Sequence, residues 1–347
     1  MNSIFGKTLF SLLAVSLCAA PLVSYAQTAK PAPHQPPVTS PLPVGPPLPT
    51  PRPSGNSRDT FERSIAVDKN VNIKLCVTQG SLKINGWNRS EVRVFVKDGS
   101  NFAFQVIQRN RQDSTPNWIN LTGFESGKNN IPAPNGCIWG DDIEIDAPTS
   151  SAVTISGGDT TTTVDSIRKI EIQTIGGDIS VRNIAERVKA QSGQGSITVD
   201  ESQGTINLES TTGNIVVFEV RPGEPGDTFR ARTNSGNVLL EGIDHRQMTV
   251  GSVSGSVVYS GDILSSGAYS FNTTNGSIRL TLPQDTSCKL GVVYGFGAFA
   301  SEIPFKMDTE NVSPGPIKRV AGNLGKGGDA TLKLATNNGS ISIKKRP

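Results

Sequence analysis

The sequence predicts an all-β fold, a β-solenoid (parallel β-helix-like) of short strands with about 18–23 residues per rung. The first observation is a recurring phrase of glycine, a small polar residue and an aliphatic residue. It occurs at Gly80, Gly158, Gly177, Gly195, Gly213, Gly236, Gly255, Gly276 and Gly339, with Gly158 as a weaker copy. The second observation is the spacing, because the steps from Gly158 to Gly276 are 19, 18, 18, 23, 19 and 21 residues. A steady period near 20 is typical of stacked rungs.

The third observation is a set of aliphatic columns on either side of the glycine. Two residues after it stand Leu82, Ile179, Ile197, Ile215, Val238, Val257, Ile278 and Ile341. Apolar residues also recur five and seven residues before the glycine, so the buried parity changes across it. A change of parity indicates a corner between two sheets, and glycine allows the positive φ that a corner often needs.

A column of hydroxyl residues stands three residues before the glycine, and by parity it faces inward. Its members are Thr174, Ser192, Ser210, Thr233, Ser252, Thr273 and Thr336. Stacked rungs lie about 4.8 Å apart, so the sequence predicts a hydroxyl ladder along the axis. No base accompanies the column, which argues against a row of nucleophiles.

The chain begins with segments that do not follow the repeat. Residues 1–26 are predicted to be a signal peptide, with Lys7, an apolar run from Leu9 to Ala20 and small residues before the end. Residues 27–58 are rich in proline and form an extended linker, either a stalk or a disordered leader. No other stretch is long enough to span a membrane. We expect an exported protein of the periplasm, the cell surface or the medium, with no transmembrane segment in the mature chain.

Residues 59–347 form the predicted solenoid domain, with two departures from the repeat. Residues 98–141 are expected to be an irregular insertion or cap, and residues 287–330 an irregular C-terminal segment. Open solenoid ends can pair with other chains, so such segments could cover them.

The net charge and the cysteine content further restrict the class of protein that this sequence can encode. The formal net charge is +3 with scattered Lys and Arg, so the chain lacks the electrostatic footprint of a nucleic-acid-binding protein. Export allows disulfides, and Cys76, Cys137 and Cys288 remain after signal cleavage. We predict a Cys76–Cys137 bond because both residues lie early in the domain; the alternative is three free thiols.

The chain resembles a bacterial family of exported proteins called putative adhesins, a β-solenoid domain of unknown function. The resemblance spans roughly residues 60–345 and rests on the opening at 80–87 with 91–94, on the middle repeats, and on the closing segments 325–328, 332–336 and 338–341. It implies a right-handed stack of short strands at the cell envelope. The family carries no agreed catalytic residues to transfer to this chain.

Candidate chemistry in the sequence is sparse. Asp141, Asp142, Glu144 and Asp146 form an acidic cluster with alternate members on one strand face, either a solvated face or a carboxylate site like those of polysaccharide-cleaving β-helices. His245 is expected to be a surface turn residue without a partner. Asp159, Asp178 and Asp329 follow Gly-Gly pairs, which suits corner turns better than a nine-residue calcium repeat. We therefore expect no cofactor, no metal and no catalytic residue.

One outward column is unexpectedly apolar. Val216, Leu239 and Val258 stand on three consecutive rungs where other rungs carry polar residues, and Phe218 should face the same way. An apolar stripe on a polar sheet face usually contacts something. Either an intramolecular loop covers it, with 221–227 or 291–325 as candidates, or it is a binding surface for a partner or a second copy.

These observations predict a non-enzymatic, adhesin-like binding or structural module of the envelope or surface. Its partner would be an envelope or surface protein or a polysaccharide, and not a nucleic acid. One alternative is an envelope polysaccharide-active enzyme that uses Asp142 and Glu144. Another is a self-assembling envelope scaffold that uses the solenoid ends or the apolar stripe.

Overall fold

The computed structural model describes residues 60–107, 115–125, 131–133, 135–312 and 317–346, all within the compact unit Gly55–Pro347. The predicted signal peptide (1–26) and Pro-rich linker (27–58) lie outside the described residues. The described chain is built of strands, and no helix in it is long and apolar enough to cross a membrane.

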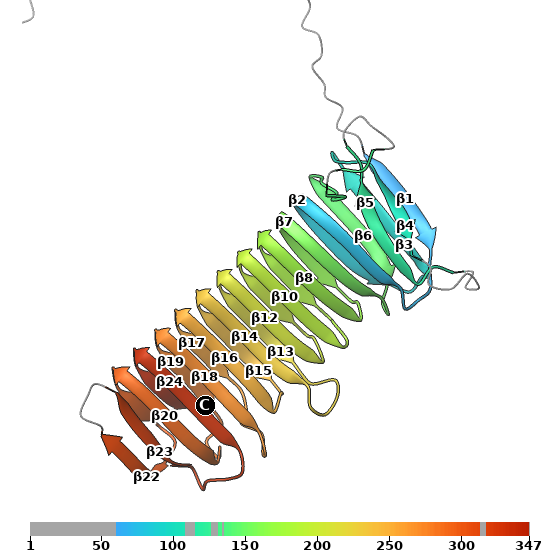
Figure 1. Ribbon diagram of the computed structural model, residues 1–347. Helices are drawn as coiled ribbons and strands as arrows, with labels where there is room; N and C mark the ends of the chain where they lie inside the picture. Colours follow the sequence, from blue (N-terminus) through green and yellow to red (C-terminus); the bar gives the residue numbers. More distant parts are fainter. Residues whose placement is uncertain (1–59, 108–114, 126–130, 134, 313–316, 347) are drawn as a thin grey trace, which may run out of the picture. The chain divides into compact units, whose positions relative to one another are not determined.

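Two parallel sheets form the stack, and each rung contributes one strand to each (Figure 1). The regular strands of sheet 1 are β8 (Lys169–Gly176), β10 (Arg187–Gln194), β12 (Thr205–Thr212), β14 (Thr228–Ser235), β16 (Gln247–Ser254), β18 (Ala268–Asn275) and β24 (Thr331–Asn338). Those of sheet 2 are β9 (Ile179–Arg182), β11 (Ile197–Asp200), β13 (Ile215–Val220), β15 (Val238–Ile243), β17 (Val257–Ser260), β19 (Ile278–Leu282) and β25 (Ile341–Lys345). The prediction of an all-β solenoid is confirmed.

The predicted columns form the core between the two sheets. Ile197, Ile215 and Val238 are fully buried, and in-register pairing stacks each on its neighbour. Val188, Ile206 and Phe229 form the matching column of sheet 1. A single rung buries little apolar surface, so the stability of the domain depends on this continuous stacking.

The corner glycines are fixed by two separate constraints. Gly195, Gly213, Gly236 and Gly255 have φ between +149° and +155°, which residues with a side chain rarely adopt. The backbone of the preceding rung is also very close, because a Cβ on Gly213 would lie 2.1 Å from the carbonyl oxygen of Gly195. Glycine is therefore required at these corners both by conformation and by space.

The hydroxyl column faces inward but does not form a ladder of hydroxyl groups bonded to each other. Six of its seven hydroxyls donate instead to the corner-glycine carbonyl of the preceding rung, while the buried Thr174 hydroxyl has no partner among the described residues. The donor-to-acceptor pairs are Ser192 to Gly177, Ser210 to Gly195, Thr233 to Gly213, Ser252 to Gly236, Thr273 to Gly255 and Thr336 to Gly276, at 2.8–3.5 Å. These hydrogen bonds therefore connect each rung to the corner of the preceding rung.

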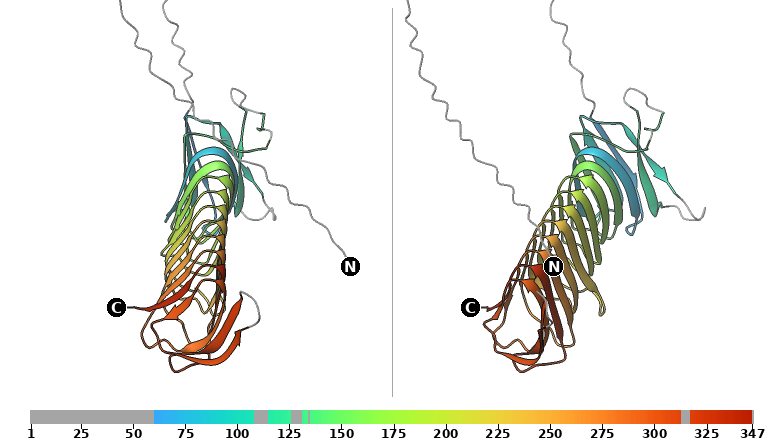
Figure 2. Two further views of the ribbon diagram at one scale, coloured as in Figure 1. Left: turned by 90° about the vertical axis from the view of Figure 1, so that its left-hand side faces the viewer. Right: turned by 60° about the vertical axis from the view of Figure 1, so that its left-hand side comes forward.

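The prediction of a corner at Gly158 is wrong by two residues. Thr160 pairs with Gly80 and therefore holds the corner position in this rung. The reason is that β7 (Ala152–Asp165), like β2 (Asn72–Trp87), runs through both sheets as one long curved strand (Figure 2).

The N-terminal end is built by strands that fold back beyond β2. β5 (Trp118–Gly123) and β6 (Asp142–Pro148) pair with the two halves of β2 on the side away from β7. β4 (Phe102–Val106) then pairs antiparallel with β5, while β3 (Glu91–Lys97) and β1 (Phe61–Ala66) continue antiparallel beyond β6. Segment 98–141 thus contributes β4 and β5 to sheet 1 at this end.

The C-terminal segment 287–330 is not irregular. β20 (Cys288–Phe296) and β21 (Phe299–Ser301) add a further rung beside β24 and β25, and β23 (Lys318–Leu324) and β22 (Phe305–Val312) extend sheet 1 antiparallel. The rung turns at Gly297, whose φ is +153°. It does not match the repeat because Ala298 and Phe299 follow the glycine in place of a polar residue and an aliphatic one.

Candidate functional site

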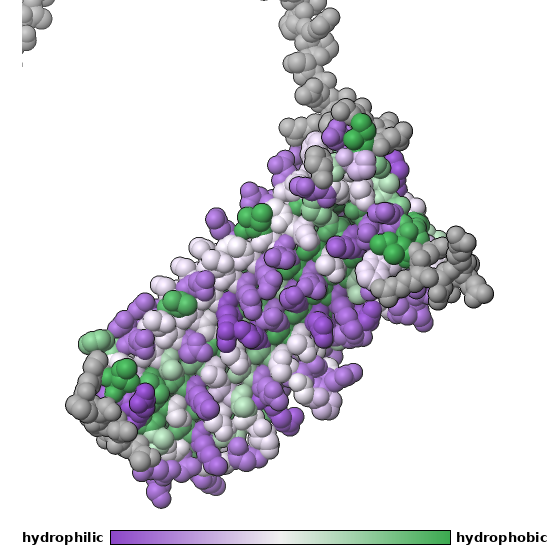
Figure 3. Space-filling model, viewed as in Figure 1, coloured by the Kyte–Doolittle hydropathy of each residue, from purple (hydrophilic) through white to green (hydrophobic). Residues whose placement is uncertain are grey.

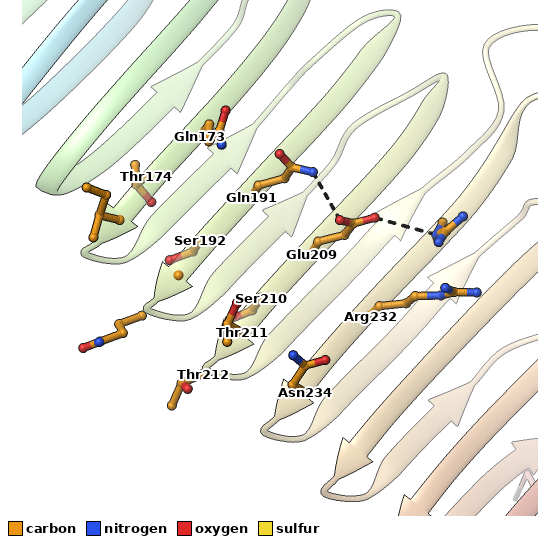
Figure 4. A pocket seen from close by; sticks show the side chains of 14 residues that line it. Gln173, Thr174, Gln191, Ser192, Glu209, Ser210, Thr211, Thr212, Arg232 and Asn234 are labelled. Carbon is orange, nitrogen blue, oxygen red and sulfur yellow. Dashed lines mark hydrogen bonds and ion pairs between the residues drawn. The ribbon is translucent and has the colours of Figure 1, made fainter.

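A hollow with a polar lining lies on the outer face of sheet 1, across β8, β10, β12 and β14 (Figure 4). We call it the polar groove. It is lined by Gln173, Gln191, Glu209 and Arg232 from one outward row, by Arg230 from a second, and by Ile175, Gly193, Thr211 and Asn234 from a third. In-register pairing of the four strands brings these residues together.

Charges within the polar groove are only partly paired. The Gln191 amide donates to Glu209 Oε2 at 3.2 Å, and Glu209 Oε1 lies 3.8 Å from Arg230 Nε (Figure 4). Arg232, on the same strand as Arg230, is exposed and has no ion-pair partner among the described residues. The groove thus presents one uncommitted guanidinium beside amide and hydroxyl groups.

The hollow owes its depth to Gly193. Its neighbours in the same outward row are Ile175, which is 71% exposed, and Thr211. Gly193 carries no side chain, and a Cβ there would meet the Ile175 carbonyl oxygen at 2.5 Å. The glycine forms a floor over which a ligand can approach the backbone.

Such a lining can hold a hydroxyl-rich ligand that carries negative groups. Amides both donate and accept hydrogen bonds, and a guanidinium matches a carboxylate with two parallel bonds. The groove is not predicted from the sequence, because polar residues in an outward column are what a solvated sheet face normally carries. A signal does exist in the sequence: Gln173, Gln191, Glu209 and Arg232 each stand one residue before the hydroxyl column, in consecutive rungs.

The predicted apolar stripe is a real juxtaposition on the outer face of sheet 2. Val216, Leu239 and Val258 are neighbours in register, and Leu239 is 39% exposed while the other two are half-buried. Phe218 is half-buried and pairs with Glu241. The stripe is flanked by Glu219 and Glu241, which line a hollow together with Phe218.

In the part of the chain that the structure describes, neither candidate loop covers this stripe. In segment 221–227, the backbone N–H groups of Gly223 and Glu224 donate to Asp227, and Asp227 also accepts from the Thr205 hydroxyl at the start of β12 in the preceding rung. The described parts of 291–325 form the end strands β20 to β23. The exposure of Leu239 contradicts the interpretation that an intramolecular loop buries the stripe.

The acidic cluster is divided among structural roles on and before β6. Asp146 is nearly buried; it accepts a hydrogen bond from Arg93 Nε at 2.8 Å and one from Asn85 Nδ2 at 3.2 Å. Asp142 Oδ2 lies 3.9 Å from Lys97 Nζ, and Glu144 stands between Asp142 and Asp146 on the same face of the strand. The pairing of Asp146 with Arg93 leaves Asp142 and Glu144 as the outward carboxylates of this strand.

Two of the aspartates after Gly-Gly pairs serve turns, whereas Asp159 lies within β7. Asp178 Oδ1 accepts from the Ser196 backbone N–H at 2.7 Å, and Asp329 accepts from the Ser266 hydroxyl. Across the described ranges, no group of three or more His, Cys, Asp or Glu side chains could hold a metal ion.

His245 is not a surface residue. It is fully buried, its Nε2 lies 2.8 Å from the Gly204 carbonyl oxygen, and its ring lies 5.8 Å from that of Phe229. Burial lowers the pKa of His245, against the opposing effects of the Gly204 carbonyl and of Asp227 and Asp244. The prediction of a surface residue is wrong because the turn after β15 folds inward at Ile243 and His245.

The cysteines lie at the two ends of the stack. Cys76 and Cys137 are joined by a disulfide with a Cα–Cα distance of 4.5 Å, which links β2 to the rung beyond it. Cys288 is free and buried at the start of β20, and burial raises its pKa to about 11.

Comparison with solved structures gives distant likenesses. A putative adhesin from Parabacteroides distasonis has a TM-score of 0.39 and 10% identity, covering 82% of this chain and 97% of its own. A putative adhesin from Bacteroides fragilis has 0.36 and 14%, with 83% and 97% covered. A putative lipid binding protein from P. distasonis has 0.37 and 10%, again with 83% and 97% covered.

A search of curated proteins found no match. The Toastrack DUF4097 family, in contrast, matches residues 64–344, which include the regular rungs and the strands at both ends. This chain therefore belongs to the Toastrack DUF4097 family.

Proposed function

We propose that the domain is a non-enzymatic, adhesin-like binding module that holds an acidic polysaccharide in the polar groove of sheet 1. The observation that carries the proposal is the exposed Arg232, which has no ion-pair partner among the described residues, beside a row of amide side chains. A carboxylate on a sugar would pair with this guanidinium, and neighbouring hydroxyls would bond to Gln173, Gln191 and Asn234.

The regular stack suits a polymer. Rungs follow one another at about 4.8 Å, so an extended chain laid across β8 to β14 meets a new set of side chains at each rung. Many weak contacts along one chain add to a useful affinity.

The test is titration of the protein with polygalacturonate and with its fully methyl-esterified form. We expect binding of the acidic polymer only, and a loss of affinity of roughly tenfold in Arg232→Gln, as for one charge-assisted hydrogen bond. Arg279→Gln is the matched control, because Arg279 is also exposed but lies on sheet 2. Equal binding of both polymers, or equal loss in the two variants, would refute the groove proposal.

The same experiment separates binding from catalysis. Release of new reducing ends from the polymer would favour the polysaccharide-active enzyme, with Asp142 and Glu144 as its carboxylates. Binding without release supports the adhesin-like module.

A second surface is the apolar stripe of Val216, Phe218, Leu239 and Val258, which we propose as a contact for a partner protein of the envelope. Its support is the exposure of Leu239, between Val216 and Val258, in a column that is polar on most other rungs. Replacing Leu239 and Val258 by Thr should abolish capture of that partner from envelope extract while the melting temperature stays unchanged. Unfolding of both variants would instead make the stripe part of the core.

We also propose that the chain is exported to the periplasm, cell surface or medium, as its predicted leader implies. Fractionation of cells with an antibody against the domain tests this. Recovery of the chain in the cytoplasm, with residues 1–26 still attached, would contradict it.

A further inference from the structure

Among the described residues, both ends of the stack present strands that are paired on one side only. At the N-terminal end these edge strands are β4 in sheet 1 and β1 in sheet 2, and at the C-terminal end they are β22 and β21. Such edges offer unpaired backbone groups to another chain. Natural edges are usually protected by charges; β4 contains no charged residue, whereas β22 carries Lys306, Asp308 and Glu310.

Exposed apolar side chains gather at the same two ends, as Figure 3 shows for one face. Near the N-terminal end are Val106, Ile107 and Ile131, which are 37–47% exposed. At the C-terminal end are Phe296, Met307 and Ile317, which are 45–69% exposed. The longer middle of the stack exposes three more, Ile175, Leu239 and Val253, at 39–71%. Each end therefore carries as many exposed large apolar residues as all the middle rungs together.

The strand order makes the two ends stepped in opposite ways. Beyond the rung of β24 and β25, sheet 1 adds β20, β23 and β22, whereas sheet 2 adds only β21. Beyond β2, sheet 1 adds β5 and β4, whereas sheet 2 adds β6, β3 and β1. Sheet 1 is therefore the longer sheet at the C-terminal end and the shorter sheet at the N-terminal end. When two copies are stacked in the same direction, the longer edge of sheet 1 in one copy meets its shorter edge in the next.

Strand direction also fits. β22 runs parallel to the strands of sheet 1, because two antiparallel pairings separate it from β20, while β4 runs antiparallel to them. If copies share one axis and one direction, β22 of one copy meets β4 of the next as an antiparallel pair. Antiparallel pairing is the slightly more stable arrangement.

From these observations we infer that copies of this domain associate head to tail, with the β22 edge of one copy against the β4 edge of the next. The contact is heterologous and does not close, so it produces open chains of domains. This inference is independent of the polar groove, which lies on the middle rungs.

The test uses sedimentation velocity of the whole purified chain over a broad concentration range, with one lysine placed at each end. Met307→Lys blocks the C-terminal end, and Val106→Lys blocks the N-terminal end; both positions are exposed, and circular dichroism checks the fold. If Val106→Lys unfolds, Gln105→Lys takes its place. Leu239→Lys is the control, because it puts the same charge on the middle of sheet 2.

We expect the wild type and Leu239→Lys to form chains that grow with concentration, and each end variant alone to stay monomeric. An equimolar mixture of the two end variants should form dimers and nothing larger, since one intact head and one intact tail remain. A wild type that stays monomeric, association lost only in Leu239→Lys, or no dimers in the mixture would each overturn the inference.

Discussion

At the scale of single residues, the corner glycine and the hydroxyl of the following rung act as a unit. The glycine brings its carbonyl close to the next rung, and the Ser or Thr there donates to that carbonyl. The recurring phrase in the sequence marks this unit, which explains why glycine rather than Asn or Asp holds the position.

Replacing Gly213 by Ala should destabilise the domain by roughly 3 kcal/mol or more, because it combines a strained φ with overpacking. Chemical denaturation measures the change. Gly226→Ala is the first control, since Gly226 has φ +100° but a Cβ there would meet nothing within 4 Å, so only strain of about 1 kcal/mol applies. Gly291→Ala, with open space and no positive φ, should be nearly neutral. Equal effects at all three positions would contradict the corner account.

The buried His245 should make stability depend on pH. Its folded pKa lies below the ordinary 6.5, so the unfolded chain binds the proton more readily. The stabilising contribution is complete above about pH 6.5 and is lost as the pH falls toward the folded pKa, at up to about 1.4 kcal/mol per pH unit.

Denaturation curves of the wild type and of His245→Gln, recorded between neutral and mildly acidic pH, measure this effect. The variant should lose the part of the slope that lies just below pH 6.5, because glutamine does not titrate. Parallel slopes in the two proteins would show that His245 gains its proton freely in the folded state.

At the scale of elements, the disulfide fixes the first rungs. It joins residues 61 positions apart in the sequence and links β2 to the rung beyond it. The chain-entropy model gives such a cross-link about 4 kcal/mol of stabilisation. A double variant with Cys76→Ser and Cys137→Ser should have a free energy of unfolding that is lower by that amount. Its strands β4 and β5 should become exposed to solvent first.

Thiol labelling provides the matching control. Native protein should take up no alkylating reagent, because Cys288 is buried and its pKa is raised to about 11. In denaturant without reductant, one cysteine per mature chain should react. Labelling of Cys76 or Cys137 under those conditions would contradict the bond.

The regular rungs could be predicted from the sequence, because the glycine period and the alternating columns follow directly from the repeat. The end strands could not, because they pair with strands distant in the chain: β2 inserts between β6 and β7, and β24 inserts between β18 and β20. Nothing in a local pattern shows that a strand enters between two others. The strand that contains Phe299 could not be predicted for a simpler reason. Ala298 and Phe299 follow Gly297 where the repeat has a polar residue and an aliphatic one.

Of the two candidate sites, likewise, one could be predicted from the sequence and the other could not. The apolar stripe could be predicted, since it depends only on in-register stacking of Val216, Leu239 and Val258. The polar groove depends on the pairing of particular charges. Glu209 forms its ion pair with Arg230 and not with its register neighbour Arg232. That choice depends on side-chain geometry, which the sequence does not contain.

At the scale of the whole molecule, the stack separates its functions in space. The core columns and corner units hold the rungs together, the outer face of sheet 1 presents the polar groove, and the outer face of sheet 2 presents the apolar stripe. The two ends carry the unpaired edges. Changes on one surface should therefore leave the others intact, because they share few contacts.

The central claim, that the polar groove holds an acidic polysaccharide, is tested most directly by a crystal structure of the protein with an oligogalacturonate. The account predicts sugar density across β8 to β14, with a carboxylate in hydrogen-bond contact with Arg232 and hydroxyls on Gln191 and Asn234. Density over Asp142 and Glu144 on β6, or on the face that carries Leu239, would contradict it.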